Sequence, residues 1–328
     1  MREAGLTGTS ARGVPPLWKL VAAFAAVYII WGSTYLAIKF AIETMPPFTM
    51  AGTRFLTAGA ILYVFARARG ATAPRGVHWV SALVIGTLLL MGGNGAVTWS
   101  QQRIPSGVAA LLVTITPCWM VLLDWLRPDG TRPTRPIVLG LMLGLSGVAL
   151  LIGPESLMGG GRVDPIGAAV LLAGSVSWAT GSIHSRHARV PSRPLLATGM
   201  QMLCGGSVLL IAGRIAGESS IDVAHVSLRS VLAFAYLVVF GAIIGYSAYV
   251  YLLRVSTPAR ASTYAYVNPV VAVFLGWALA GESLTPRMLV AALVIVSGVA
   301  LITLSRQPGA APGSSPSTAA IRPEEPIA

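Results

Sequence analysis

The chain has 328 residues, of which 55 % are hydrophobic and only 10 % are charged, and its mean hydropathy is +0.74. Soluble domains carry about 25 % charged residues, so the composition excludes an ordinary soluble protein and places most of the chain in lipid. The net charge of +12 could suit a nucleic-acid binder, but no basic cluster lies in a folded soluble segment, which excludes nucleic acid as a partner.

Ten apolar stretches are long enough to cross the hydrocarbon core, which takes about 20 helical residues. In chain order they cover approximately residues 20–40, 47–66, 79–100, 106–125, 136–152, 166–184, 195–213, 230–253, 260–280 and 287–304. The first is uncharged from Leu20 to Ile38, and no small-residue cleavage site follows it, which favours a span over a signal peptide. We therefore predict an all-α polytopic membrane protein with ten transmembrane helices.

The distribution of basic residues predicts the orientation. With ten spans both termini lie on one side, and the loops and tails of that side hold 16 Lys and Arg residues, against six on the opposite side. Because cytoplasmic loops are enriched in Lys and Arg, we predict that both termini are cytoplasmic. The basicity of the chain is then an orientation signal.

The two halves of the chain resemble each other. A shift of 147 residues places Trp31 on Trp178 and Gly59 on Gly206, and a shift of 152 places Pro117 on Pro269. Five spans per half is an odd number, so the second copy enters the membrane from the opposite side, as in many secondary transporters. The predicted organisation is a cytoplasmic tail (1–19), a first repeat (20–152), an outer linker (153–165), an inverted second repeat (166–304) and a disordered cytoplasmic tail (305–328).

Pro117 and Pro269 are expected to break the fourth and ninth spans. Each removes an N–H and displaces the carbonyl four residues earlier, at Val113 and Ala265. In lipid such a carbonyl needs a polar neighbour or a wet cavity, so one interpretation is a central cavity at the two helix breaks. The alternative is a packing kink with a locally bonded Thr or Asn.

Several helices carry polar or aromatic faces that could line such a cavity. Trp31, Tyr35 and Lys39 form one stripe at helical spacing, and Tyr264 and Asn268 lie one turn apart. The alternative for the aromatic residues is a belt at the membrane interface. The predicted cavity residues are Trp31, Tyr35, Lys39, Arg54, Asn94, Trp99, Thr116, Trp178, Tyr246, Tyr264 and Asn268.

Arg54 is an arginine inside a span, which costs about 2.5 to 3.5 kcal/mol on insertion scales. It lies seven residues past Pro47, so its side chain could reach the outer interface by snorkelling. If it faces inward instead, a substrate carboxylate or phosphate is its natural partner. The sequence leaves both possibilities open.

The acidic residues, histidines and cysteines argue against catalysis. No Asp or Glu lies in the middle of a span, which removes the buried carboxylate of a proton-coupled multidrug exchanger. "GLSG" (144–147) has the shape of an intramembrane serine-protease motif, but all four histidines lie at span ends or in loops, and packing of small residues explains it. Cys118 and Cys204 lack metal-ligand spacing, so we predict no catalytic residue, metal site or cofactor.

Four stretches carry a resemblance to a known family: "WGSTYLAIKFAIETMPPFTMAGTRF" (31–55), "PSGVAALLVTITPCWMVLL" (105–123), "NPVVAVFLGWALAGESLT" (268–285) and "SGVALI" (297–302). They resemble the EamA branch of the drug/metabolite transporter superfamily, within it the YedA-like inner-membrane permeases. The resemblance implies a ten-helix bundle with a central cavity and alternating access. By position it matches Lys39 and Arg54 to the family's basic residues, and Glu282 to its Gly-Glu corner, where we expect Glu282 to cap the helix that follows.

Together these patterns predict a multi-pass protein of the plasma (inner) membrane that acts as a secondary transporter. Its expected substrate is a small molecule, such as an amino acid or an amphipathic or aromatic compound, moved outward by alternating access. It would work in the lipid bilayer as a monomer or homodimer. The alternatives are a membrane-embedded enzyme that acts on a lipid or peptide, and a passive channel.

Overall fold

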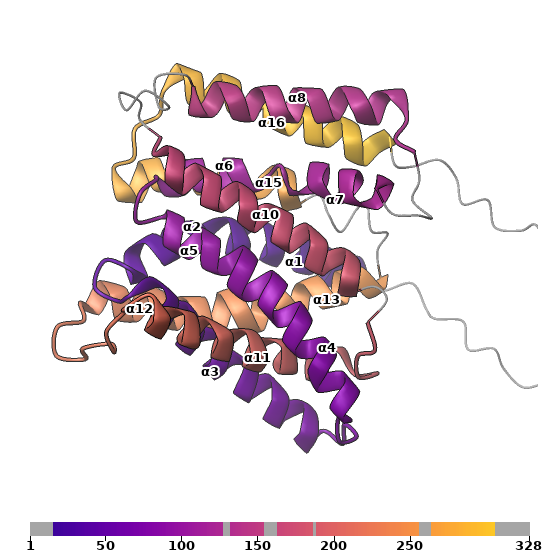
Figure 1. Cartoon of the computed structure of the whole chain (residues 1–328), viewed down its shortest axis with the longest axis vertical. Coiled ribbons are helices and arrows are strands. Elements are labelled where there is room, and N and C mark those ends of the chain that lie inside the picture. Colours follow the sequence, from indigo (N-terminus) through magenta and orange to yellow (C-terminus); the bar gives the residue numbers. More distant parts are fainter. Residues whose placement is uncertain (1–15, 127–131, 154–162, 186–187, 256–263, 306–328) are drawn as a thin grey trace, which may run out of the picture.

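The computed structural model describes residues 16–126, 132–153, 163–185, 188–255 and 264–305. Across these ranges the regular structure is helical and contains no strand (Figure 1). Eight helical segments are long and apolar enough to cross a membrane: Leu17–Ala41, Pro47–Ala68, Gly76–Ser100, Ser106–Trp125, Arg135–Ile152, Pro165–Ser185, Pro194–Ile215 and Leu228–Tyr249. Two more apolar helices, Val267–Ala280 and Pro286–Ile302, are shorter. The all-helical membrane class is confirmed, and ten crossings stay a prediction.

The first half contains ten of the helical elements. They are α1 (Leu17–Ala26), η1 (Val27–Trp31), α2 (Gly32–Ala41), α3 (Pro47–Ala68), α4 (Gly76–Gly86), η2 (Thr87–Gly95), α5 (Ala96–Ser100), α6 (Ser106–Val113), α7 (Thr116–Trp125) and α8 (Arg135–Ile152). The second half contains α10 (Pro165–Ser185), α11 (Pro194–Ile215), α12 (Leu228–Tyr236), η3 (Leu237–Ile244), α13 (Gly245–Val255), α15 (Tyr264–Ala280) and α16 (Pro286–Ser305). The predicted disorder of the C-terminal tail falls outside the described residues.

Prolines mark where many of the helices begin. Pro47, Pro165, Pro194 and Pro286 are each the first residue of a helix, where the missing N–H has no intrahelical partner to lose and the fixed φ suits the helix. These positions lie within one residue of the predicted span starts, so the prolines in the sequence marked the first residues of several helices.

Three spans contain a stretch of π-helix, which the sequence did not predict. The stretches are η1, η2 and η3, and η2 and η3 begin 150 residues apart, close to the shift that relates the two halves. A π-helical stretch widens the turn and is often found at functional sites. Trp31 and Asn94 lie at or near the ends of η1 and η2, and Tyr246 lies just after η3.

Two helix pairs that join the halves are packed backbone to backbone at glycines. A Cβ added at Gly59 on α3 would lie 2.9 Å from the Gly199 oxygen on α11, and one at Gly140 on α8 would lie 2.6 Å from the Gly298 oxygen on α16. Small residues let helices approach this closely in membranes, where packing rather than a hydrophobic force holds them together. Gly140 and Gly144 therefore serve packing, as the sequence interpretation of "GLSG" expects.

Other contacts between helices also come in corresponding sets. α10, the first helix of the second half, packs against the third span (α4, η2 and α5) and the fourth span (α6 and α7). In the same way the first span (α1, η1 and α2) packs against the eighth span (α12 and α13) and the ninth (α15). The described ends at Leu17 and Ser305 lie on the same side of the bundle (Figure 1).

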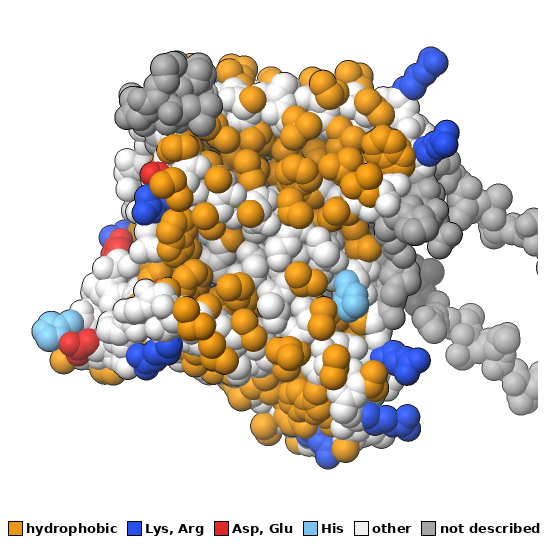
Figure 2. Space-filling model, viewed as in Figure 1, with side chains coloured by type: hydrophobic (Ala, Val, Ile, Leu, Met, Phe, Trp, Pro, Cys, Tyr) orange, Lys and Arg blue, Asp and Glu red, His pale blue; other side chains and the backbone are white. Residues whose placement is uncertain are grey.

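The surface separates apolar and charged side chains. Figure 2 shows one face whose middle is covered by apolar side chains, while most Lys and Arg side chains lie toward the left and right ends. The acidic side chains visible on this face all lie toward the left end. This distribution fits a bilayer whose normal runs from left to right in the figures.

Candidate functional site

An aromatic cluster lies where the two halves of the chain meet. The ring of Trp31, from the first half, lies 5.5 Å from Tyr246, 5.0 Å from Tyr249 and 5.2 Å from Tyr264, all from the second half, measured between ring centroids. Tyr249 and Tyr264 are edge to face at 5.8 Å and share a hydrogen bond. We call these four residues the aromatic cluster. Rings in this arrangement present both faces and edges to an aromatic or cationic ligand.

The backbone around Trp31 explains its position. Trp31 ends η1, and its indole Nε1 donates to the Gly241 oxygen in η3 at 3.3 Å. A Cβ at Gly245 would lie 2.5 Å from the same indole nitrogen, so a larger residue there would push the ring away. Two π-helical stretches and one glycine therefore fix the tryptophan against the second half.

Asn268 and Pro269 are both buried in α15 next to this cluster. When the side-chain amide nitrogen of Asn268 faces the backbone oxygens of Tyr28 in η1 and of Tyr264 one turn earlier, it donates to both at 3.2 Å. The residue before the proline thus bonds its own helix and the first span at once. Pro269 lies inside a helix that continues past it to Ala280.

Pro117 behaves differently. Here the chain leaves the α-helix at Thr114 and Ile115, so the fourth span is divided into α6 and α7. The Val113 oxygen that Pro117 displaces accepts a hydrogen bond from the Thr116 hydroxyl at 2.6 Å. This is the local bond that the alternative interpretation expects, and a cavity at this helix break stays a prediction.

Arg54 is directed into the protein and does not snorkel. The residue is 4 % exposed, its Nη2 donates to Asn94 Oδ1 at 2.8 Å, and its guanidinium lies 4.1 Å from the centroid of the Phe55 ring. The Phe55 ring belongs to an apolar cluster against which Tyr246 also packs. Arg54 from α3 and Asn94 from η2 thus form a polar pair that is separated from Tyr246 of the aromatic cluster by this packing.

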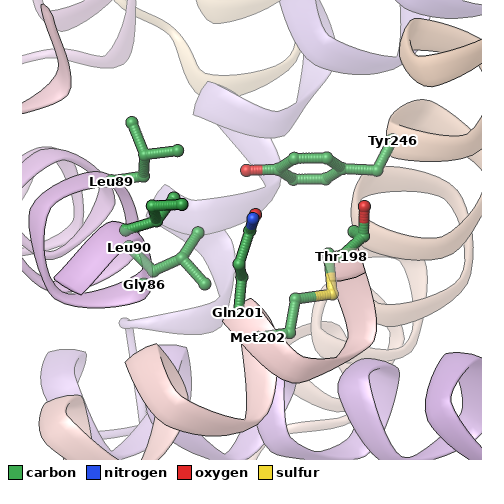
Figure 3. Close-up of a pocket in the computed structure, with 8 residues that line it drawn as sticks. Gly86, Leu89, Leu90, Thr198, Gln201, Met202 and Tyr246 are labelled. Atoms are coloured by element: carbon green, nitrogen blue, oxygen red, sulfur yellow. The ribbon is translucent and has the colours of Figure 1, made fainter. Parts of the chain in front are cut away.

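A narrow pocket, with room for about one water molecule, shares that tyrosine. It is lined by Ile85, Gly86, Leu89, Leu90, Thr198, Gln201, Met202 and Tyr246. Figure 3 shows the Tyr246 ring lying across the pocket with its hydroxyl toward Leu90, and the Gln201 side chain rising toward it from α11. The lining is apolar with a few polar groups, and in this conformation the pocket is too small to hold a metabolite.

The remaining predicted residues lie in other surroundings. The Trp178 ring covers Gly93 on η2, and Tyr35 packs against the apolar core that contains Ile104. The guanidinium of Arg103 lies over the Trp99 ring, 5.0 Å from the ring centroid. These rings are thus held by packing or by a cation.

Lys39 and Glu282 form an ion pair, with the Lys39 ammonium 3.7 Å from Glu282 Oε1, and the place of Lys39 in a cavity stays a prediction. The expected role of Glu282 requires a correction. Glu282 does not cap the following helix: its carboxylate accepts from the N–H groups of Ser106 at 2.7 Å and Gly107 at 3.1 Å, at the start of α6. Thr285 caps α16 instead, by accepting from the Met288 N–H at 3.2 Å.

A second glutamate corner of the same kind was not predicted from the sequence. Glu218 accepts from the N–H groups of Phe48 at 2.9 Å and Thr49 at 2.7 Å, at the start of α3. Both glutamates follow a glycine with positive φ, Gly217 at 78° and Gly281 at 65°, a conformation that glycine adopts freely. The repeated letters "AGES" at 216–219 and 280–283 were the available signal. A carboxylate suits exposed helix N–H groups and the positive end of the helix dipole.

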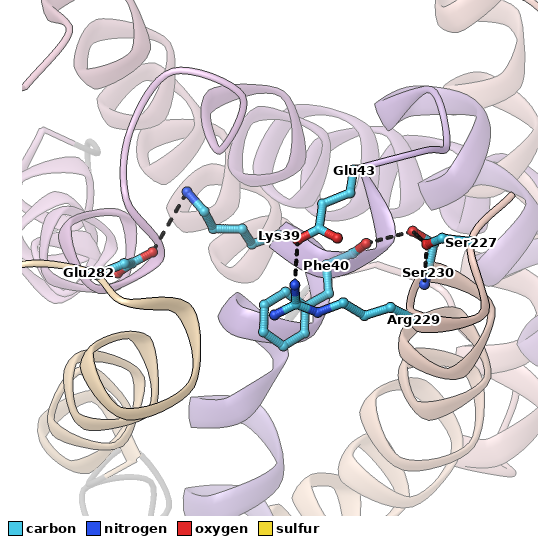
Figure 4. Close-up of polar contacts among 7 residues, drawn as sticks. All are labelled: Lys39, Phe40, Glu43, Ser227, Arg229, Ser230 and Glu282. Atoms are coloured by element: carbon cyan, nitrogen blue, oxygen red, sulfur yellow. Dashed lines mark hydrogen bonds and ion pairs between the residues drawn. The ribbon is translucent and has the colours of Figure 1, made fainter.

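Further polar contacts join the halves at the end of the bundle predicted to face outward. Arg229 lies 3.3 Å from Glu43 and stacks over the Phe40 ring at 3.5 Å, while the Ser230 hydroxyl donates to the Phe40 oxygen at 2.8 Å (Figure 4). Arg103 and Asp164 form another ion pair at 3.4 Å. Lys39–Glu282 and Glu43–Arg229 thus link residues of opposite halves at this end, and Arg103 pairs with a residue of the outer linker.

No group of three His, Cys, Asp or Glu side chains that could hold a metal ion occurs in the described ranges. The serine of "GLSG", Ser146, is exposed, and its hydroxyl donates to the Leu143 oxygen at 2.9 Å. This local bond occupies the hydroxyl that the enzyme alternative would need as a nucleophile.

Comparisons with known proteins agree on one family over most of the chain. Residues 17–153 and 165–304 each match the EamA-like transporter family. The chain is 43 % identical over 291 residues to the inner membrane transporter YedA of Escherichia coli (strain K12), covering 88 % of this chain and 92 % of that protein. It is 26 % identical over 280 residues to the transporter YvbV of Bacillus subtilis (strain 168), covering 85 % and 89 %.

One solved crystal structure superposes with a TM-score of 0.62 at 23 % identity, covering 88 % of this chain and 97 % of that one, a likeness of fold alone. The family match and the identity to YedA carry the assignment. The chain belongs to the EamA-like transporter family and is a transporter, not an enzyme.

Proposed function

We propose that this transporter exports small amphipathic metabolites, such as amino acids or aromatic compounds, across the inner membrane by alternating access. The observation that carries the proposal is the aromatic cluster, in which Trp31 of one half is surrounded by three tyrosines of the other. A ligand between these rings would contact both halves at once, so its binding and release would respond to their relative movement. The membrane is inferred from the relative YedA, an inner membrane transporter.

Two observations support the ten-span inverted repeat with both termini in the cytoplasm. The family matches the two halves separately, at 17–153 and 165–304. The contacts of α10 with α4, η2 and α5 correspond to those of the first span with α12 and α13, as expected if the halves are related by a pseudo-two-fold axis in the membrane plane. We expect the active form to be a monomer or homodimer.

Alternating access would use the two ion pairs that join opposite halves at the predicted outer end, Lys39–Glu282 and Glu43–Arg229. Each is partly exposed, so each contributes little free energy and can break and re-form during transport. In the conformation described here these contacts hold the outer ends of the halves together. We infer that substrate enters from the cytoplasm in this state and leaves after the pairs open.

The substrate class follows from the chemistry of the site. The aromatic cluster offers ring faces for an apolar or cationic part of the ligand, and the neighbouring pocket is lined mainly by Leu, Ile and Met. Rigid amphipathic molecules with a ring or branched side chain fit such a lining. Polar sugars would leave the apolar walls without partners.

A survey of released metabolites tests the proposal. Cells that overproduce the protein and cells that lack it are compared for compounds that appear in the medium, and the flux of each candidate is then measured against its internal concentration. Saturable release of an amphipathic compound by the overproducing cells supports a transporter that exports it. Release that rises without saturation would indicate a passive channel, and accumulation inside the cells would indicate import.

A further inference from the structure

Arg54 carries a buried positive charge without a negative partner among the described residues. The four ion pairs in the described ranges use other groups, and the Nε atom of Arg54 is buried without a hydrogen-bond partner there. The side chain is 4 % exposed, and a guanidinium does not lose its proton in a protein. A permanent charge at this depth in a membrane is expensive unless it has a function.

The neighbours of Arg54 orient the guanidinium without neutralising it. Asn94 Oδ1 accepts one hydrogen bond at 2.8 Å, and Phe55 contributes its ring face. Each of these groups is uncharged, so the site holds a fixed fork of N–H donors with one net positive charge. A fork of this geometry matches the two oxygens of a carboxylate.

The position of the fork connects it to the proposed transport site. The Tyr246 ring lies 5.5 Å from that of Trp31, lines the narrow pocket, and packs against the apolar cluster that contains Phe55, the residue whose ring lies against the Arg54 guanidinium. A molecule with its apolar part at the aromatic cluster or in the pocket could therefore place a charged end against Arg54. Tyr246 would then lie beside both the apolar part and the charged end of the ligand.

We propose that Arg54, oriented by Asn94, binds the carboxylate of the transported metabolite and makes the protein selective for amphipathic carboxylates over their neutral analogues. This inference rests on the proposed function, because the ligand is taken to be the substrate. A carboxylate is favoured over a phosphate because a single cation balances one negative charge, and the other predicted basic cavity residue, Lys39, is already paired with Glu282. The subsite thus selects monoanions.

Binding to the purified full-length protein tests the subsite. Two matched probe pairs are used at constant ionic strength: phenylacetate with phenylacetamide, and hexanoate with hexanamide. In the wild type each carboxylate is expected to bind about 10- to 100-fold more tightly than its amide, the range of a hydrogen bond to a charged group. Equal affinity within both pairs, or no carboxylate binding, overturns the proposal.

Three variants assign the preference to Arg54. Arg54→Gln is expected to bind acid and amide equally, and Arg54→Lys to keep part of the preference. Arg67→Gln, which removes an exposed arginine from the last turn of the same helix, is expected to behave as the wild type. An unchanged preference in Arg54→Gln would overturn the proposal. If Arg54→Gln does not fold, the wild-type comparison still decides.

Transport by the same protein in liposomes separates this inference from the proposed function. Binding of phenylacetate that depends on Arg54, with no probe moved across the membrane, would leave the subsite standing and remove the proposed function. Transport of the amides as fast as the acids, unchanged in Arg54→Gln, would keep the proposed function and remove the subsite.

Discussion

The side-chain amide of Asn268 lies 3.2 Å from the backbone oxygen of Tyr28, with the nitrogen turned toward it, and so joins α15 to the π-helical stretch of the first span. The bond places the residue before Pro269 between two helices from opposite halves, within one turn of the tyrosine that meets Trp31. If the halves move during transport, this bond lies at their contact.

Replacing Asn268 by Leu tests that role. The change removes the donor from the Tyr28 oxygen, and a carbonyl without a partner is costly in the membrane interior. We expect transport to fall by at least about 10-fold, equivalent to roughly 1.4 kcal/mol, while the protein still inserts into the membrane. Transport is measured in cells with matched protein amounts. Gln102→Leu, which removes an exposed amide, is the control; full activity of Asn268→Leu would remove Asn268 from the site.

The glutamate corners make a prediction about stability. Glu218→Ala leaves the N–H groups of Phe48 and Thr49 at the start of α3 without an acceptor, and loss of a helix cap costs about 1 to 2 kcal/mol. The Tm of the purified protein should fall accordingly. Asp222→Ala removes an exposed carboxylate four residues later and is expected to change stability by less than about 0.5 kcal/mol. Equal effects of the two changes would contradict the capping role.

The glycine contacts between α3 and α11 predict a second stability difference. A methyl group at Gly59 would lie 2.9 Å from the Gly199 oxygen, so Gly59→Ala should destabilise the protein by about 1 to 3 kcal/mol. Gly76→Ala is the matched control, because no atom lies within 4 Å of the added Cβ. Thermal unfolding in detergent measures both. If Gly59→Ala were as stable as the wild type, close packing of α3 against α11 at this glycine would not contribute to the free energy of unfolding.

Alternating access predicts that linking the outer ends of the halves stops transport. In a variant with Cys118 and Cys204 replaced by Ala, Glu43→Cys and Arg229→Cys place thiols at an ion pair between the halves. A reducible bifunctional maleimide linker across this pair should block transport, and cleavage of the linker should restore it. The same linker between Asp222→Cys and His225→Cys, which lie in one loop, should have no effect. Transport at the full rate through a linked Glu43–Arg229 pair would exclude opening at this place.

Local patterns in the sequence predicted the helices well. Apolar length gave the spans, and prolines such as Pro47 and Pro194 marked where helices begin, because both signals depend on neighbouring residues alone. The association of Trp31 with tyrosines was also partly visible, since Tyr246 and Tyr249 share a helix face. Tyr249 could have been included in the predicted site on that spacing.

Contacts between distant parts of the chain were not predictable in the same way. Glu282 caps a helix 176 residues earlier, and the direction of Arg54 depends on how α3 is rotated against η2. The π-helical stretches that position Trp31 and Asn94 have no sequence signature of this kind. Such features depend on tertiary packing, which a single sequence does not display.

The most direct test of the central claim compares two tryptophan replacements in the export of a compound found in the metabolite survey. Trp31 lies in the aromatic cluster between the halves, whereas Trp277 is 51 % exposed on the outer surface of α15. We predict that Trp31→Leu reduces the rate of export by at least about 10-fold and that Trp277→Leu leaves it within about twofold of the wild type, at equal amounts in the membrane. Equal export by Trp31→Leu and the wild type would contradict a substrate site between the halves.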